Sequence, residues 1–326
     1  MKHAFLTILL AASSAGLANA QQIQPPHSFA AVTVRLHNGT AAGGDVAGDS
    51  VKLTVDAQGR PVASMEGEAD AEGKAVFENV VTGNGIAAVA QARHGDMSFG
   101  GEALNLEPGK TSFETVVEVY EVSTDNTQLS VGSHHFILRA QGNSLVITEV
   151  MQLTNPTDRA VSSATKDADG KPQVVHVYLP AGHHNFNAGE YFVADALIFT
   201  PEGFYDTMAI PPGTYRAVFA YEIPITGKTT EIRKTMSMPV SDFAVFSQLP
   251  PGSIEGLGPA RPMADADAEA EYFASAAYDA GRTLTFKVVG FNTEYSDARD
   301  IVILSGIFAV VVLLGVLRLV RKPRAA

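Results

Sequence analysis

Residues 111–122 read TSFETVVEVYEV, and this stretch decides the fold class because polar and apolar residues largely alternate along it. Successive side chains of a β-strand point to opposite faces of a sheet, so alternation predicts a strand with one buried side. The β-branched and aromatic residues of the stretch fit a pleated, half-buried surface. We therefore expect a long strand here and not a helix.

The segments before this strand repeat the pattern in shorter form. Predicted strands cover residues 29–36, 51–55, 75–81, 86–93 and 97–106. Turn signals rich in Gly, Asn and Asp separate them, such as DAQG at residues 56–59, and these residue types favour tight turns. Short strands with turn signals at roughly 8 to 12-residue intervals are typical of a β-sandwich. We predict one sandwich domain over residues 29–122.

The segments after it form a second set of predicted strands. They cover residues 131–139, 144–153, 174–179, 191–200, 215–225, 229–238 and 283–291. We expect one hairpin at QGN, residues 141–143, and another at TGK, residues 226–228, each joining the strands on its two sides. These strands predict a second β-sandwich domain over residues 123–295.

An acidic turn in the first domain carries a family resemblance. It reads Glu68-Ala-Asp70-Ala-Glu72-Gly73-Lys74-Ala-Val-Phe77, followed by Asn79, Val80 and Gly83. This run resembles the T-D-x-x-G-x-F-x-F-x-x-L-x-x-G hairpin of carboxypeptidase regulatory-like domains. The first predicted strand, VTVRLHNGT, departs from the G-x-V-x-D/N opening of that family. The resemblance covers residues 29–122 and implies a transthyretin-like, carbohydrate-binding-like fold with a binding or spacer role and no catalytic residues.

The second domain is similar to the second domain of certain membrane-anchored exported proteins that carry a regulatory-like domain in front. The similarity lies in PPG at residues 211–213, in a strand ending YEIP at 221–224, and in AGRTLTF at 280–286. It implies an immunoglobulin (Ig)-like sandwich and a link to c-type cytochrome assembly. The expected fold class is therefore all-β, with two Ig/transthyretin-like β-sandwich domains plus one C-terminal transmembrane helix.

Both ends of the chain predict export. Residues 1–20 combine a basic start, a short apolar core and the A-x-A site Ala18-Asn19-Ala20, which is the layout of a cleavable signal peptide. Residues 301–320 contain no charge before Arg318 and are long enough to cross a hydrocarbon core of about 30 Å. The basic tail at 321–326 predicts a cytoplasmic C-terminus. We expect a single-pass protein of the inner membrane with a large domain in the periplasm or outside.

The charge of the predicted outer part excludes one class of partner. All 35 Asp and Glu residues lie between residues 21 and 300, against 18 of the 23 Lys and Arg residues, which gives a formal charge of −17. Such a surface repels phosphate backbones, so we expect no nucleic-acid partner. The chain has no cysteine, which excludes disulfides, thiol catalysis and thiolate metal sites.

Two histidine pairs offer a metal site. His134 and His135 lie on a predicted strand, and His183 and His184 follow a Pro-Ala-Gly turn. If the sandwich brings the pairs together, the imidazoles could bind copper or zinc. Adjacent residues of a strand point to opposite faces, so only one histidine of each pair can face a shared site. The alternative is that all four are partly exposed sandwich residues.

Other chemistry has weaker signals in the sequence. The runs DADG at 167–170 and DAEG at 70–73 fit turns better than a calcium loop. No G-x-S-x-G, H-E-x-x-H or phosphate-loop motif occurs, so we predict no enzyme activity. A possible sugar-stacking face draws on Tyr178, Tyr191, Phe192, Phe204, Tyr205, Tyr215 and Tyr221, which are as consistent with a core.

These patterns together predict a membrane-anchored interaction or assembly module of the cell envelope, without catalysis or a cofactor of its own. The expected partner is an envelope protein. A periplasmic copper- or zinc-binding protein and a carbohydrate or cell-wall binder are the two alternatives.

Overall fold

The computed structural model describes residues 28–262, 270–275 and 277–290. These residues are all-β: they form strands in several sheets and two short 3-10 helices, and no α-helix occurs among them. The predicted signal peptide at 1–20, transmembrane helix at 301–320 and basic tail at 321–326 lie outside the described residues. Within them, no helix has the length and apolar character needed to cross a membrane.

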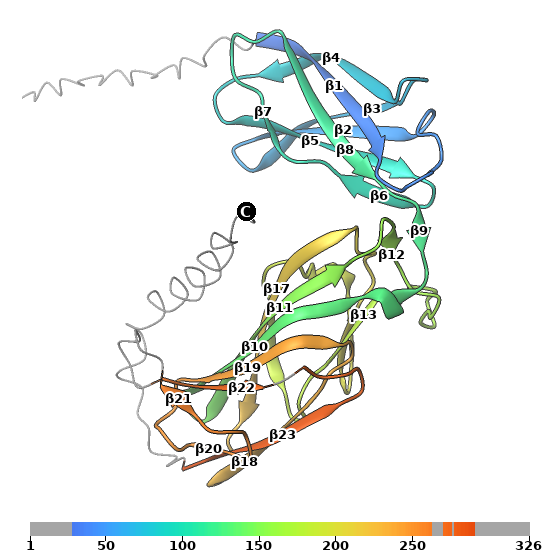
Figure 1. The fold of residues 1–326 in the computed structure, drawn as a ribbon. Helices are drawn as coiled ribbons and strands as arrows, with labels where there is room; N and C mark the ends of the chain where they lie inside the picture. Colours follow the sequence, from blue (N-terminus) through green and yellow to red (C-terminus); the bar gives the residue numbers. More distant parts are fainter. Residues whose placement is uncertain (1–27, 263–269, 276, 291–326) are drawn as a thin grey trace, which may run out of the picture. The chain divides into compact units, whose positions relative to one another are not determined.

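The chain divides into two compact units. Of the described residues, unit 1 takes in those up to His37 and Val46–Glu118, and unit 2 takes in Asn38–Asp45 and those from Val119 onward. Each unit has its own sheets, drawn in blue to blue-green for unit 1 and in green to red for unit 2 (Figure 1).

Unit 1 contains two sheets, and most of their strands alternate between buried and exposed residues, β3 being the exception. One sheet has the order β4-β1-β8 and the other has the order β3-β2-β5-β6, with β7 also paired to β5. The strands are β1 (Ser28–Asn38), β2 (Ser50–Ala57), β3 (Arg60–Glu68), β4 (Lys74–Thr82), β5 (Ile86–His94), β6 (Met97–Gly100), β7 (Leu104–Asn105) and β8 (Ser112–Val119). The arrangement is consistent with a β-sandwich.

The core of unit 1 is built from small aliphatic side chains. Val32 and Val34 of β1 and Leu53 and Val55 of β2 are fully buried, and Ala88 and Ala90 of β5 are nearly so. Burial at every second position is what the alternating sequence predicted. Phe77 of β4 is one of the few large side chains in this core.

The acidic run that carries the family resemblance forms the turn between β3 and β4. Asp70 Oδ1 accepts hydrogen bonds from the backbone N–H groups of Glu72 and Lys74. Gly73 has a φ of +72°, which is strained for a residue with a Cβ. DADG in unit 2 has the same geometry, because Asp167 Oδ1 accepts from the N–H groups of Asp169 and Lys171. In both runs the first carboxylate holds its own turn.

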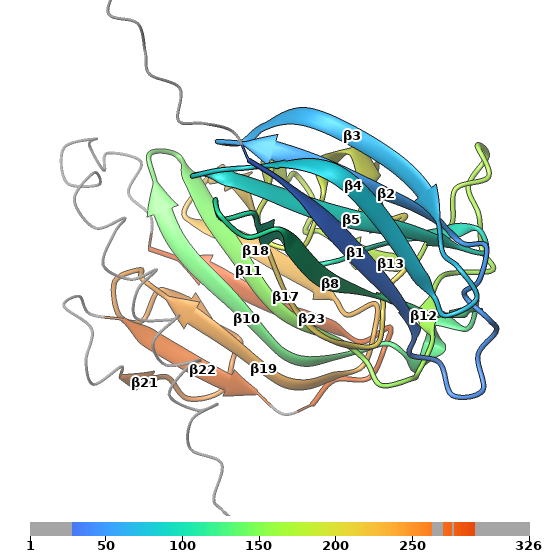
Figure 2. The same cartoon turned by 90° about the horizontal axis from the view of Figure 1, so that it is seen from above.

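Unit 2 is built on a seven-stranded sheet with the order β14-β17-β11-β10-β19-β22-β21. Strands β10, β11 and β17 run side by side in it (Figure 2). Two three-stranded sheets, β13-β16-β15 and β18-β23-β20, and the pair β9–β12 complete the unit.

The elements of unit 2 are as follows. The strands of the large sheet are β10 (Ser130–Gln141), β11 (Ser144–Asn155), β14 (His184–Ala188), β17 (Gly213–Pro224), β19 (Val240–Ser247), β21 (Arg261–Pro262) and β22 (Glu271–Ser275). The others are β9 (Val122–Ser123), β12 (Ala160–Val161), β13 (Val175–Tyr178), β15 (Leu197–Thr200), β16 (Gly203–Asp206), β18 (Thr229–Thr235), β20 (Ile254–Glu255) and β23 (Thr283–Val289), with 3-10 helices η1 (Asn126–Gln128) and η2 (Ala194–Ala196).

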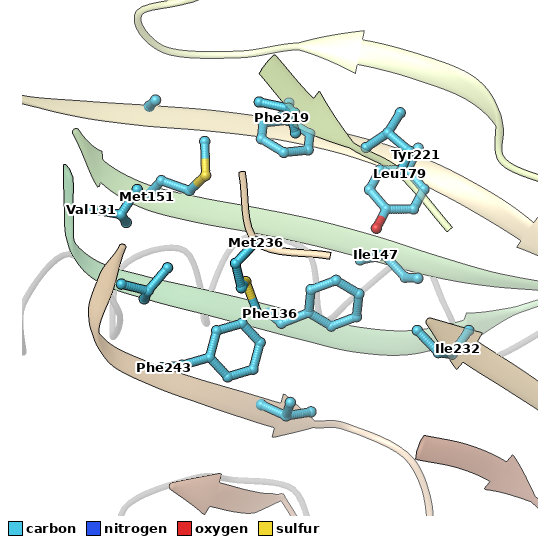
Figure 3. Close-up of a cluster of buried hydrophobic side chains, with 14 of the residues drawn as sticks. Val131, Phe136, Ile147, Met151, Leu179, Phe219, Tyr221, Ile232, Met236 and Phe243 are labelled. Atoms are coloured by element: carbon cyan, nitrogen blue, oxygen red, sulfur yellow. The ribbon is translucent and has the colours of Figure 1, made fainter. Parts of the chain in front are cut away.

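The two smaller sheets pack against the large sheet through aromatic side chains. Phe204 of β16 lies with its ring 5.4 Å from that of Phe219 on β17. Phe286 of β23 lies 6.0 Å from Phe136 on β10. Both contacts are edge-to-face, the arrangement that aromatic quadrupoles favour. The core of unit 2 lies between these layers (Figure 3).

The structure corrects several sequence predictions. The predicted hairpin at residues 226–228 is wrong, because β17 lies in the large sheet whereas β18 pairs with β23. The predicted strand 191–200 is shortened to β15, because η2 occupies residues 194–196. Strand 111–122 is interrupted after Val119 and resumes as β9. The hairpin at residues 141–143 is confirmed, with Gln141 paired to Ser144.

Candidate functional site

A buried carboxylate, Glu149, lies at the centre of unit 2. Its side chain is fully enclosed, and three side chains bind its two oxygens. His134 Nε2 lies 2.7 Å from Oε2, the Tyr221 hydroxyl donates to Oε1 at 2.7 Å, and Lys234 Nζ lies 2.9 Å from Oε1 and 2.7 Å from Oε2. Lys234 also donates to the backbone carbonyl of Tyr178 at 2.7 Å. We call Glu149, His134, Tyr221 and Lys234 the Glu149 centre.

Four strands from two layers position these side chains. His134 comes from β10, Glu149 from β11 and Tyr221 from β17, which are neighbours in the large sheet. Lys234 comes from β18, in a different sheet, and reaches across the core to Glu149. Figure 3 shows Tyr221 with its hydroxyl oxygen directed into the core.

Burial and charge compete at Glu149, His134 and Lys234, and they act in the same direction at Tyr221. Burial alone would raise the pKa of Glu149, but the positive charge of Lys234 and the hydrogen bond from His134 lower this pKa to about 2. Burial lowers the pKa of His134 and that of Lys234, and the carboxylate opposes both shifts. Burial raises the pKa of Tyr221 well above its usual value. We infer an ionised Glu149 paired with Lys234, beside a neutral His134 and a neutral Tyr221.

The two oxygens of Glu149 are thus occupied, and the ring nitrogen of His134 that faces away from Glu149 is a further acceptor in the centre. His134 donates through Nε2, and its Nδ1 makes no hydrogen bond to any described residue. The neutral ring therefore has a free lone pair on Nδ1. The centre is suited to orienting this imidazole, and Glu149 itself has no oxygen left to take a proton from a substrate.

A small pocket lies beside the Glu149 centre, and methionines are concentrated in it. Its lining combines strands of the large sheet with β13 and the end of β18: Val131, His134, Met151, Val177, Tyr178, Lys234, Thr235, Met236, Ser237, Met238 and Val240. Three of the eight methionines of the chain therefore line one pocket next to a buried histidine.

The four predicted metal-binding histidines occupy different surroundings. His134 is buried in the Glu149 centre, whereas the ring of His135 lies on the other face of β10, 5.1 Å from that of Phe246. His183 Nδ1 lies 3.0 Å from the carbonyl oxygen of Pro180. His184 is exposed, with Nε2 3.7 Å from a carboxylate oxygen of Glu222.

These positions leave the four-histidine site a prediction. Within the described ranges, no three His, Asp or Glu side chains are grouped so that they could hold a metal ion. His183 comes nearest to the Glu149 centre, since its ring lies 6.3 Å from that of Tyr221.

The aromatic residues considered for a sugar-stacking face lie in the core of unit 2 or against it. Phe192, Phe204, Tyr205 and Tyr221 are buried, and Tyr178, Tyr191 and Tyr215 are half-buried. A sugar-binding face on unit 2 would therefore need other residues.

A second buried carboxylate, Asp206 of β16, has a different environment. It is fully buried, and its Oδ1 accepts a hydrogen bond from the N–H of Met208 at 2.9 Å. Its Oδ2 has no hydrogen-bond partner among the described residues. Burial raises the pKa of Asp206 to about 6, although backbone N–H groups oppose the shift. The side chain is thus poised to be protonated in mildly acidic conditions.

Sequence analysis missed the Glu149 centre, although a signal for it was present. Glu149 stands in the apolar run of β11, SLVITEVMQL, two residues from Ile147 and two from Met151. Lys234 stands in the same way between Ile232 and Met236. Period-2 spacing puts each charge on the inward face of its strand. Two opposite charges at inward positions predict a buried pair, but not which strands meet.

Comparisons with known proteins add no functional assignment. No family model matches the chain, and no curated protein matches it. The major pilin SpaD from Corynebacterium diphtheriae is a structural match with 10% sequence identity, over 79% of this chain and 80% of the pilin, at a TM-score of 0.20. Likeness at that level carries no argument about function.

Proposed function

We propose that the chain is an exported interaction or assembly module of the cell envelope, held in the inner membrane by residues 301–320. In this proposal unit 1 is a transthyretin-like, carboxypeptidase regulatory-like sandwich and unit 2 is an Ig-like sandwich. The signal-like start, the apolar segment near the end and the acidic charge of the span between them support this role. The link to c-type cytochrome assembly rests on the sequence resemblance alone.

The observation that carries the proposal is the edge strand β3 of unit 1. Among the described strands β3 pairs only with β2, so no described strand is paired to its other edge. Seven of its nine residues are exposed, including Val62, which is 55% exposed. A free edge offers backbone N–H and C=O groups to an incoming strand, which is a recurrent mode of protein recognition.

Site-specific photo-crosslinking in living cells tests the proposal. A photoreactive residue at position 62 is compared with one at position 89, an outward position on β5 in the interior of the same sheet. We expect a specific envelope protein to be captured from position 62 and not from position 89.

Val62→Lys supplies the second arm of the experiment. The change adds a charge at an exposed edge position, so we expect loss of the captured partner without loss of folded protein. Equal capture from positions 62 and 89, or capture that Val62→Lys leaves unchanged, would contradict the β3 interface. Full recovery of the chain in a soluble periplasmic fraction would contradict the anchor.

A further inference from the structure

Three methionines and one histidine converge on the pocket beside the Glu149 centre. We propose that this pocket is a Cu(I) site, with His134 Nδ1 and the thioether sulfurs of Met151, Met236 and Met238 as ligands. This Cu(I) site shares only His134 with the predicted four-histidine site. It requires neither the membrane anchor nor the β3 interface of the proposed function.

Strand pairing brings His134 beside Met151, and Met236 and Met238 line the same pocket. His134 and Met151 are directly paired across β10 and β11, so their side chains lie on the same face and close together. Met236 and Met238 follow the end of β18, where the chain bends, and both belong to the lining of the pocket. All four residues line the same pocket. Figure 3 shows Met151 reaching the core from β11 and Met236 from the segment after β18.

The ligand set selects the metal. Thioether sulfur is a soft, neutral ligand that suits Cu(I), and imidazole also suits copper. Calcium and magnesium require oxygen ligands, and structural zinc sites use thiolate, imidazole or carboxylate. The chain has no cysteine whose thiolate would compete for the ion.

The Glu149 centre prepares the imidazole for this role. Histidine ligands usually donate their other ring N–H to a carboxylate, which fixes the tautomer and makes the ligating nitrogen more basic. His134 has this arrangement, because Nε2 lies 2.7 Å from Glu149 Oε2 and Nδ1 has no hydrogen-bond partner among described residues. Glu149 is therefore a positioning residue in the proposed site.

Lys234 gives the site its charge selectivity. Its ammonium group balances the carboxylate of Glu149 at 2.7 Å, so the surroundings of the pocket carry no net negative charge. A divalent ion would bring two uncompensated charges into a buried site, and a monovalent ion brings one. The arrangement therefore favours Cu(I) over Zn²⁺.

The pocket has a route to the surface. Tyr178, Thr235, Ser237 and Met238 line it and are only half-buried. Of the three methionines, Met238 is the most exposed, whereas Met151 and Met236 are buried.

An anaerobic Cu(I) titration of the full-length chain in detergent, against a chromophoric Cu(I) chelator, tests the site. We expect one Cu(I) per chain. The variant Met151→Leu/Met236→Leu/Met238→Leu should lose this uptake, and each exchange of Met for Leu conserves volume and so keeps the core packed. Met208→Leu, at a methionine that is 44% exposed, is the matched control and should bind like the wild type.

Carbon-13 labelling of the methionine methyl groups identifies the ligands directly. Ag(I), a redox-inactive ion of the same charge and softness, should shift the methyl signals of Met151, Met236 and Met238 and leave those of Met65, Met97 and Met208 in place. No Cu(I) uptake, or equal uptake by the triple Leu variant, would overturn the proposal. Shifts confined to methionines outside the pocket would do the same. Failure of crosslinking at position 62 has no bearing on either result.

Discussion

The two units enclose different interiors although both are made of strands. Unit 1 is filled with aliphatic side chains such as Val32 and Leu53, and its contact between His94 and Asp49 at 2.7 Å is only part-buried, with 15% of the Asp49 side chain exposed. Unit 2 encloses aromatic rings together with a fully buried ion pair, Glu149 with Lys234. Among the described residues, unit 2 therefore encloses charge more deeply than unit 1 does.

Buried charge is costly, so its presence in unit 2 calls for an explanation. A buried ion pair seldom adds net stability over a well-packed apolar replacement, whereas removing one partner is strongly destabilising. In unit 2 the pair also orients His134 toward a pocket. The Glu149 centre is therefore better explained by the proposed Cu(I) site than by stability.

The largest expected effect comes from breaking the Glu149 centre. Glu149→Leu leaves Lys234 buried without a counter-charge, and we expect unit 2 to lose about 3–5 kcal/mol of unfolding free energy. All nine tyrosines lie beyond residue 119, so tyrosine fluorescence during urea denaturation reports unit 2. The double variant Glu149→Leu/Lys234→Met removes both charges and should recover most of the loss. A double variant as unstable as the single one would show that the pair itself stabilises the fold.

An apolar truncation in unit 1 gives the converse test. Leu53→Ala removes a fully buried side chain from β2, and we expect a loss of about 2–5 kcal/mol from the lost burial and the cavity. Hydrogen exchange of the β2 and β5 amides should accelerate, while the tyrosine transition of unit 2 stays in place. Joint movement of both transitions would mean that the units unfold together.

The raised pKa of Asp206 predicts that the stability of unit 2 depends on pH. Its pKa is raised to about 6 from 3.8, so its contribution to stability is complete below pH 3.8 and is lost as pH rises through about 6. The difference between wild type and Asp206→Asn should therefore change by about 2–3 kcal/mol between pH 4 and pH 7, in favour of the wild type at the acidic end. Urea midpoints across this range measure it, and parallel curves would exclude the raised pKa.

The contribution of Glu149 to the stability of unit 2 should depend on pH in the opposite direction. Its pKa is lowered to about 2 from 4.5, so its contribution is present above pH 4.5 and is lost as pH falls toward 2. The pH dependence of the stability of unit 2 is thus set mainly by Asp206 in mild acid and mainly by Glu149 in strong acid.

The smallest expected loss of stability comes from removing the hydroxyl of Tyr221 while keeping its ring. Tyr221→Phe removes one hydrogen bond to the buried carboxylate and keeps the packing, so we expect a loss of about 1.5–3 kcal/mol. Differential scanning calorimetry of both proteins at pH 7 measures the change. If the hydroxyl only fills space, the variant will melt at the wild-type temperature.

Several features of the fold could be predicted from local sequence. Alternation identified β1, β2, β4, β5, β10 and β11 with bounds within a few residues of the structure, because period-2 burial is a property of each strand alone. The turn at QGN was predicted for the same kind of reason, since Gly142 adopts a φ of +54°. Strand β3 was missed because nearly all its residues are exposed and give no alternating signal.

The pairing of strands could not be predicted in the same way. TGK at residues 226–228 looks like a hairpin turn, yet the chain after it leaves the large sheet and joins β23. The pairing depends on which apolar face β18 must cover, and that face belongs to strands distant in sequence. The residues of the turn are compatible with pairing of β18 either to β17 or to β23.

The sequence by itself determined the all-β class, the turns that Asp70 and Asp167 hold, and the absence of any thiol chemistry. Only the tertiary structure decided what meets in the core. Glu149 and Lys234 are 85 residues apart and lie in different sheets, and Met151 joins Met236 only because those sheets pack together. Side-chain alternation is set by the backbone of a single strand, whereas a buried site is set by the closure of layers, which no local pattern encodes.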